Sequence, residues 1–157
     1  MEVRLVRALE ADATSIFDIQ VRAFAPLLEK YQDYDTNPGN ETIDRVIWRI
    51  NDPNGAFYKI VEGHVTVGAI RIRWHDEPTQ LWISPLFIAP EHQGRGYAQQ
   101  AIALAEQAYP DAVCWELATL LEEERNCRLY EKMGYVRTGE LSKLNERATL
   151  VFYRKIL

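Results

Sequence analysis

Hydrophobic and polar residues alternate over residues 3–7, which predicts a short β-strand, and six further runs that are apolar or rich in β-forming residues predict the others. The pattern indicates strands over residues 3–7, 56–62, 65–74, 80–89, 112–119, 135–144 and 148–156. Gly63 and His64 separate the second strand from the third, so they are predicted to form the turn of a hairpin.

Apolar residues recur at intervals of three and four in four other segments, which predicts amphipathic helices. The first helix contains Ile16 and Leu27, and the second starts near Glu41 with Asn40 as its N-cap. The third and fourth cover residues 96–109 and 122–133. The element order β-α-α-β-β-β-α-β-α-β-β predicts an α/β chain with a mixed sheet covered by helices.

Composition limits the classes of protein that fit this pattern. The 157 residues, 47% of them apolar, suit one domain over residues 1–157 with a single core. A net charge of −5 without long runs of like charge argues against binding of nucleic acid through overall charge. The chain has no apolar stretch near the length of about 18 residues that spans a membrane, and its first residues lack a signal-peptide core, so we expect a cytoplasmic protein. Cys114 and Cys127 are not spaced as a zinc site, and we expect them to pack in the core, with no metal.

The segment from Leu86 to Ala98 carries the clearest chemical signal. An apolar strand ends at Pro90, and a turn with two glycines opens directly into a helix. The start of a helix presents unpaired N–H groups and a partial positive charge of about half a unit, and Gly94 and Gly96 would let a phosphate approach the main chain. The order predicts a cradle for an anion. The alternative is that the two glycines only shape a tight turn.

Two motifs in this sequence resemble those of the Gcn5-related N-acetyltransferase (GNAT) superfamily. The run Gln93 to Ala98 fits the pattern Gln/Arg-x-x-Gly-x-Gly/Ala of its acyl-CoA pyrophosphate loop, and residues 86–90 look like the strand that precedes it. The run Asn126 to Tyr135 resembles the end of the superfamily's fourth helix, Leu/Phe-Tyr-x-x-x-Gly-Phe/Tyr. A Rossmann dinucleotide site would need a third glycine, which is missing here.

The resemblance implies the acyl-CoA N-acyltransferase fold, of class α/β (α+β), with a mostly antiparallel seven-stranded sheet and four flanking helices. It also implies direct transfer of an acetyl group from acetyl-CoA to a primary amine in a ternary complex, through a tetrahedral intermediate. We expect a small cationic acceptor. Transfer to a protein N-terminus or lysine is an alternative, as is a catalytically silent acyl-CoA sensor, and the resemblance leaves a homodimer open.

The same resemblance assigns most of the cofactor contacts to the backbone. Leu86, Phe87 and Ile88 would face the pantetheine arm in the manner of an added strand. The diphosphate would meet the turn and the start of the helix, which consist of Gln93, Gly94, Arg95, Gly96, Tyr97, Ala98 and Gln99. Arg95 could add a charged contact to a phosphate, or be an ordinary surface arginine.

Tyr130 is the candidate general acid for the departing thiolate, because a phenol with a pKa of about 10 stays protonated at neutral pH. Core packing is the alternative role of its ring. Asn126 lies one helical turn earlier on the same face and could bond the pantetheine or the tyrosine. Many members of the superfamily have an asparagine seven residues before this tyrosine, where Glu123 stands here.

The ammonium group of the acceptor must lose a proton before it can attack, so a base or a water chain is needed. Glu116 on the fifth predicted strand is the candidate we name, and it could also be an outward-facing strand carboxylate. Further candidate bases are His75, Asp76 and Glu77, which close the third predicted strand. The alternative is that they form a charged hairpin tip.

The acceptor site implied by the resemblance is formed by the first two helices, their connection and the last hairpin. Glu29, Tyr31 and Tyr34, with Asp33 and Asp35 beside them, would give this rim an acidic and aromatic character. Such a rim suits a cationic amine through opposite charge and ring faces. The alternative is a solvated, charged end of a helix.

Overall fold

One seven-stranded sheet runs through the computed structural model, which describes residues 2–157. The strands are β1 (Arg4–Arg7), β2 (Gly55–Glu62), β3 (Val65–Arg73), β4 (Gln80–Ile88), β5 (Cys114–Leu120), β6 (Val136–Lys143) and β7 (Thr149–Ile156). The helices are α1 (Ala13–Tyr31), α2 (Ile43–Asn51), α3 (Tyr97–Ala108) and α4 (Glu124–Lys132). The order across the sheet is β1-β2-β3-β4-β5-β7-β6, and all neighbours are antiparallel except β4 and β5. This confirms the predicted fold class.

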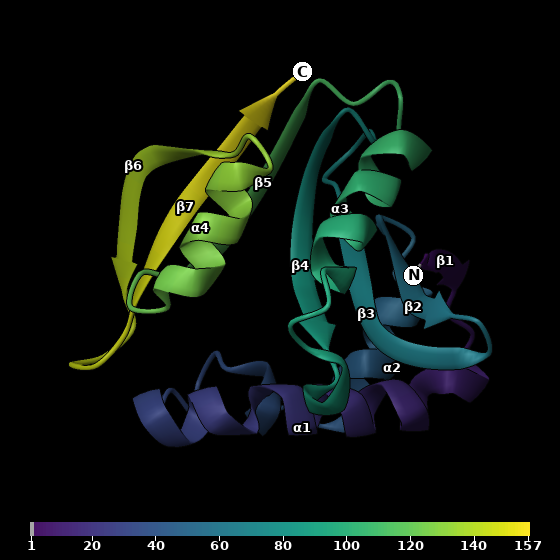
Figure 1. Cartoon of the computed structure of the whole chain (residues 1–157), viewed down its shortest axis with the longest axis horizontal. Coiled ribbons are helices and arrows are strands. Elements are labelled where there is room, and N and C mark those ends of the chain that lie inside the picture. Colours follow the sequence, from purple (N-terminus) through teal and green to yellow (C-terminus); the bar gives the residue numbers. More distant parts are fainter. Residues whose placement is uncertain (1) are drawn as a thin grey trace.

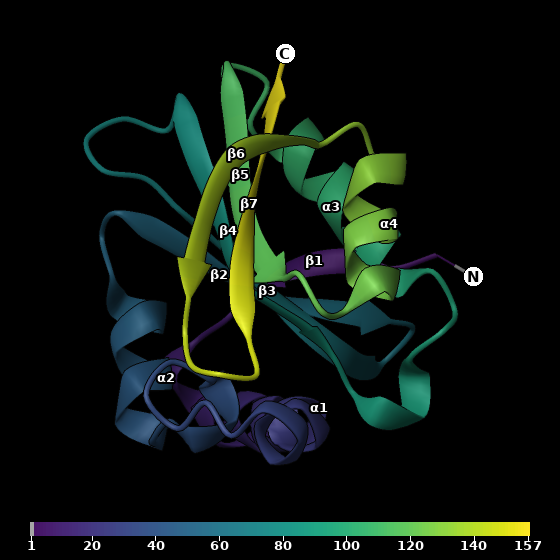
Figure 2. The ribbon, with the colours of Figure 1, turned by 90° about the vertical axis from the view of Figure 1, so that its left-hand side faces the viewer.

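Helices cover the sheet unevenly. α1 and α2 pack on one face of β2 to β4, where Ile16, Val46 and Phe57 form one apolar core. α3 packs on the opposite face, where Ile102 joins Ile70 in a second core that continues to Trp115 on β5. Figure 2 shows α3 and α4 on the same side of the sheet. The N-terminal strands therefore lie between two helical layers, and the C-terminal strands have α4 on one face.

A bulge in β4 changes which face its residues occupy. Between the pairs Ile72–Ile83 and Ile70–Leu86, β3 contributes one residue and β4 contributes two, Ser84 and Pro85. The extra residue shifts the alternation by one. Ile83 faces the α3 core before the bulge, and after it Leu86 and Ile88 pack there, whereas Phe87 turns to the α1 core.

The two halves of the sheet separate below a short joint. β4 and β5 pair only over Gln80–Trp82 with Cys114–Glu116, although β4 continues to Ile88 and β5 to Leu120. Figure 1 shows the two strands diverging from this joint toward α1. The bulge lies immediately beyond the joint, at the point where the strands part.

The start of α2 differs from its prediction. The helix begins at Ile43 with Thr42 in the N-cap position, so Asn40 as its N-cap is wrong. Residues Pro38–Asn40 form a separate short 3-10 turn instead, and the Asn40 side chain donates a hydrogen bond to the Tyr34 carbonyl at 2.7 Å. His64 does lie in the β2–β3 turn, and Cys127 is buried as predicted. Within residues 2–157, every helix is too short or too polar to cross a membrane.

Candidate functional site

The turn before α3 has the backbone conformation that its glycines permit. Gly94 and Gly96 have φ angles of 79° and 81°, in the left-handed region where other residues are disfavoured. Gly96 is the N-cap of α3 and has no side chain to cap it. The Gln100 N–H bonds to the Gly96 carbonyl at 3.1 Å, so the three amides before it, of residues 97–99, precede the first helical hydrogen bond. A Cβ added to Gly96 would meet no atom within 4 Å, and residues 96–99 line an open cavity, so an anion could approach this turn.

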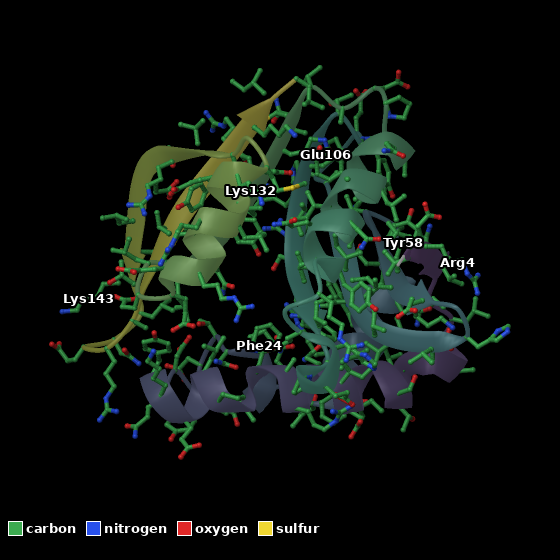
Figure 3. All side chains as sticks on the ribbon, in the orientation of Figure 1. Arg4, Phe24, Tyr58, Glu106, Lys132 and Lys143 are labelled. Atoms are coloured by element: carbon green, nitrogen blue, oxygen red, sulfur yellow. The ribbon has the colours of Figure 1, made fainter. Side chains whose placement is uncertain are left out.

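A cavity of about 750 Å³ opens over this turn, and we call it the glycine-turn cavity. Its walls come from α1, the end of β4, the turn itself and α4. The lining residues used below are Phe24, Leu27, Leu86, Ile88, Gln93, Gly94, Gly96, Tyr97, Ala98, Gln99, Glu123, Arg125, Asn126, Arg128, Tyr130 and Lys132. Figure 3 shows Phe24 rising from α1 below the space between α4 and β4.

The end of β4 presents main-chain groups to this cavity. The Ala89 N–H bonds to the Val67 carbonyl at 2.7 Å, so residue 89 directs its backbone groups toward β3. Because these directions alternate along a strand, Leu86 and Ile88 direct theirs toward the parted side. The Gln93 side chain donates to the Ile88 carbonyl at 2.9 Å, which fixes the turn to the strand. The Leu86 amide therefore points into the space between β4 and β5.

A second cavity of about 430 Å³ lies on the other side of the parted strands, and we call it the β5 cavity. Aromatic rings from four elements line it, together with two charged side chains, Asp33 and Arg73. The rings belong to Phe24, Tyr31, Trp82, Tyr130 and Phe152. Five residues line both cavities: Phe24, Leu27, Leu86, Asn126 and Tyr130. The two cavities therefore meet at the split in the sheet, beside Leu86 and Tyr130.

Tyr130 has the properties of a proton donor at this meeting point. Its ring packs against those of Tyr135 and Tyr153, with centroids 6.4 and 6.2 Å away. Burial, followed by the nearby Cys127, raises the pKa of Tyr130 to about 12. Across residues 2–157 its hydroxyl has no hydrogen-bond partner, so it is available to a bound molecule.

A second tyrosine at the site is tied to a carboxylate. Tyr31 is only 4% exposed, and its hydroxyl donates a short hydrogen bond to Oε2 of Glu123. Lys30 donates to the same oxygen at 3.1 Å. Burial, followed by the bond to Glu123, raises the pKa of Tyr31. Tyr31 lines the β5 cavity and Glu123 lines the glycine-turn cavity, so this pair spans the two.

The positive charge in the glycine-turn cavity comes from α4 rather than from the turn. Arg125, Arg128 and Lys132 line the cavity, whereas Arg95 is outside its lining. Arg95 instead approaches the Tyr97 hydroxyl, which donates a short hydrogen bond to Glu62. The phosphate contact predicted for Arg95 therefore has no support from its position.

The predicted base and rim residues are only partly brought together. The Glu116 carboxylate accepts a hydrogen bond from Nε of Arg154 at 2.9 Å, forms a salt bridge with Nη2 of the same arginine at 2.8 Å, and lines neither cavity. His75, Asp76 and Glu77 also lie outside both cavities. Of the predicted rim, Tyr31 and Asp33 line the β5 cavity, whereas Glu29 and the 58% exposed Tyr34 do not. Asn126 lines both cavities, but no hydrogen bond joins it to Tyr130.

Comparison with known proteins agrees with this geometry. Residues 13–135 match the model of the acetyltransferase (GNAT) family. A search of curated proteins finds no match. Among solved structures, an acetyltransferase from Thermus thermophilus is similar at 17% identity with a TM-score of 0.73, covering 100% of this chain and 98% of that one.

Two other solved structures have the same fold. A spermidine N-acetyltransferase from Vibrio cholerae, in complex with CoA and spermine, shares 18% identity with a TM-score of 0.78 and covers 99% of this chain and 95% of that one. A ribosomal L7/L12 alpha-N-protein acetyltransferase in complex with coenzyme A shares 14% identity with a TM-score of 0.78 and covers 100% of this chain and 95% of that one. The family match spans most of the chain, and the chain belongs to the acetyltransferase (GNAT) family. It is an N-acetyltransferase that depends on acetyl-CoA.

Proposed function

We propose that this enzyme transfers the acetyl group of acetyl-CoA to the primary amine of a small cationic molecule, with both bound at once. The observation that carries the proposal is the meeting of the two cavities at Leu86 and Tyr130, where β4 and β5 part. One cavity ends at free helix amides that suit a diphosphate, and the other is aromatic with one buried carboxylate. Acetyl-CoA supplies an activated acetyl thioester, and the residues of the chain bind, orient and move protons around it.

The amide of Leu86 and the hydroxyl of Tyr130 take complementary parts at the meeting point. The Leu86 N–H points into the parted space and would stabilise negative charge that develops on the carbonyl oxygen during attack. The Tyr130 hydroxyl stays protonated, since its pKa is about 12, and would donate to the departing sulfur. Placing both donors on rigid elements, β4 and α4, holds them in position before the substrates bind.

The Tyr31–Glu123 pair gives the ammonium proton a way out. An alkylammonium with a pKa of about 10.4 costs about 4 to 5 kcal/mol to deprotonate at pH 7. The Tyr31 oxygen would accept a proton from the ammonium as its own proton passes to Glu123, whose side chain is 23% exposed and can release it to water. One proton leaves the nitrogen and one reaches solvent, and both residues return to their starting state.

The acceptor is expected to be small because the β5 cavity has a volume of about 430 Å³. Its positive charge would lie near Asp33, which is 8% exposed, rather than near Arg73, whose guanidinium stacks on Trp82 with 5.0 Å to the ring centroid. The Asp33 carboxylate is held by the amide and the hydroxyl of Thr36. Ammonium groups also bind well against aromatic faces such as those that line this cavity.

A thiol-release screen with acetyl-CoA tests the function. Polyamines, other small amines, amino acids and peptides are offered, and acetylated products are identified by mass spectrometry. We expect cationic small amines to react, and Asp33→Asn to raise their KM about tenfold, because it removes a buried opposite charge. Asp35→Asn is the control, since Asp35 is exposed in the same loop and lines neither cavity. Intact acetyl-CoA binding with no acetylated amine would favour the sensor function, and acetylation of peptides alone would favour a protein substrate.

The proton route has its own test in the dependence of rate on pH. Tyr31→Phe should lower kcat/KM about 100-fold at pH 7, because the ammonium then loses its proton acceptor. The deficit should shrink toward pH 10, where solution already supplies the free amine. An equal loss of kcat/KM at every pH would contradict a role in proton removal. Tyr31 would then only shape the cavity.

A further inference from the structure

Arg125 occupies an unusual place for a surface arginine. It lies in the first turn of α4, and its Nη2 atom is 3.4 Å from the point where a side chain of Gly94 would begin. The guanidinium therefore covers the glycine turn from the opposite wall of the glycine-turn cavity. Because Gly94 has no side chain, the arginine can approach the main chain of the turn directly.

The charge of Arg125 is uncompensated, in contrast to the charges of Arg128 and Arg22. Across residues 2–157 it forms no salt bridge with a carboxylate. Arg128, one turn later on the same helix, is paired with Glu124 at 3.4 Å. Arg22, on the α1 side, is paired with Glu91 at 2.8 Å. An unpaired guanidinium offers a planar set of N–H donors that matches two oxygens of a phosphate.

The cofactor creates a need for such a group. A diphosphate brings two or more negative charges to a protein whose net charge is −5, and the helix amides offer only about half a positive unit. The turn's own arginine, Arg95, lies outside the cavity beside Tyr97. The Arg125 guanidinium faces the turn at Gly94.

We infer that Arg125 reaches across the glycine-turn cavity and clamps the diphosphate of CoA against the amides of residues 94–99. The inference rests on the proposed use of acetyl-CoA. In this arrangement the cofactor is held from two elements, α3 through its amides and α4 through a side chain. Binding of the cofactor therefore ties together the two halves of the sheet, since α3 packs on the first half and α4 on the second.

Calorimetry with a graded set of ligands tests the clamp. The ligands are CoA, dephospho-CoA, which lacks the 3′-phosphate, and pantetheine, which lacks every phosphate. Arg125→Gln should weaken both CoA and dephospho-CoA about 10- to 100-fold and leave pantetheine unchanged. Its CoA affinity should also fall less steeply with salt than that of the unmodified protein. Arg45→Gln is the matched control and should change CoA affinity by less than about threefold, because Arg45 is an exposed arginine on α2 that lines neither cavity.

The alternative results separate the clamp from the function. A loss confined to CoA and absent with dephospho-CoA would place Arg125 on the 3′-phosphate and overturn the inference. Unchanged affinity for all three ligands would also overturn it. Failure of the unmodified protein to bind CoA would instead contradict the proposed function. Arg125 is exposed, so the variant should fold, and circular dichroism with a thermal melt verifies this.

Discussion

The two halves of the sheet differ in how completely their strands are paired and covered. β1 to β4 are hydrogen-bonded along most of their length and lie between α1 and α2 on one face and α3 on the other. β5 to β7 have α4 on one face, and every residue of the edge strand β6 is exposed. The halves share only three residue pairs between β4 and β5. The well-packed half positions the glycine turn. The short pairing between β4 and β5 leaves the space in which both substrates can bind side by side.

Close packing in the first half predicts the largest effect. A Cβ on Gly68 in β3 would lie 2.2 Å from the Phe87 carbonyl oxygen and 3.0 Å from the Ile88 Cα. These are backbone atoms of the strand that borders the site, so they cannot move aside cheaply. We expect Gly68→Ala to lower the free energy of unfolding by about 3 kcal/mol or more, measured by urea denaturation.

The matched change in the second half sharpens the comparison. Gly139 in β6 has open space around it, and its φ of 95° is the only obstacle to a side chain. Gly139→Ala should therefore cost only about 1 to 2 kcal/mol. Equal losses at the two glycines would contradict the difference in packing between the halves.

The next effect concerns cofactor binding at the glycine turn. Gly96→Glu places a carboxylate in the open space above the α3 amides, and acetyl-CoA affinity should fall more than 100-fold in calorimetry. Gly63→Glu is the control, because Gly63 also has a positive φ and open surroundings but lies in the β2–β3 turn. It should lose stability to a similar degree and keep its affinity. Equal losses of acetyl-CoA affinity in the two variants would indicate that backbone strain, rather than the carboxylate at the turn, causes the loss.

The smallest of the three effects concerns the chemistry at the joint. Tyr130→Phe should lower kcat by up to about 100-fold while the acetyl-CoA Kd stays within about twofold, because the hydroxyl is needed only when the sulfur departs. Stopped-flow or steady-state kinetics with an identified amine measures this. With a pKa of about 12, the hydroxyl should also remain protonated up to about pH 10, so its ionisation causes no loss of rate below that pH. Unchanged turnover in the variant would contradict this role and indicate that water, rather than Tyr130, protonates the departing sulfur.

Much of this molecule could be predicted from local patterns. Short runs of sequence indicate the succession of strands and helices along the chain, the glycine turn and the helix that bears Tyr130. This is because alternation, helical spacing and left-handed glycines are local properties. The residue that bulges in β4 could not be predicted, since a bulge is defined by pairing with another strand. The two cavities also escaped prediction in detail, because Trp82 and Phe152 are far apart in sequence and meet only in the fold.

The direction in which each side chain points also could not be predicted from the sequence. Glu116 fits a base by residue type, but a cross-strand arginine, Arg154, holds its carboxylate. Arg95 sits in the motif but turns away from the cavity, and Arg125, about 30 residues later, faces the turn instead. The sequence itself shows Glu123 at the position where the resemblance leads us to expect an asparagine. Its bond to Tyr31 does not show in the sequence, because that contact joins α1 to the loop before α4.

A crystal structure of the enzyme with bound acetyl-CoA tests the central claim most directly. The account predicts the diphosphate on the amides of residues 94–99 and the thioester between Leu86 and Tyr130, where β4 and β5 part. Acetyl-CoA bound elsewhere, with its thioester remote from Tyr130, would contradict it.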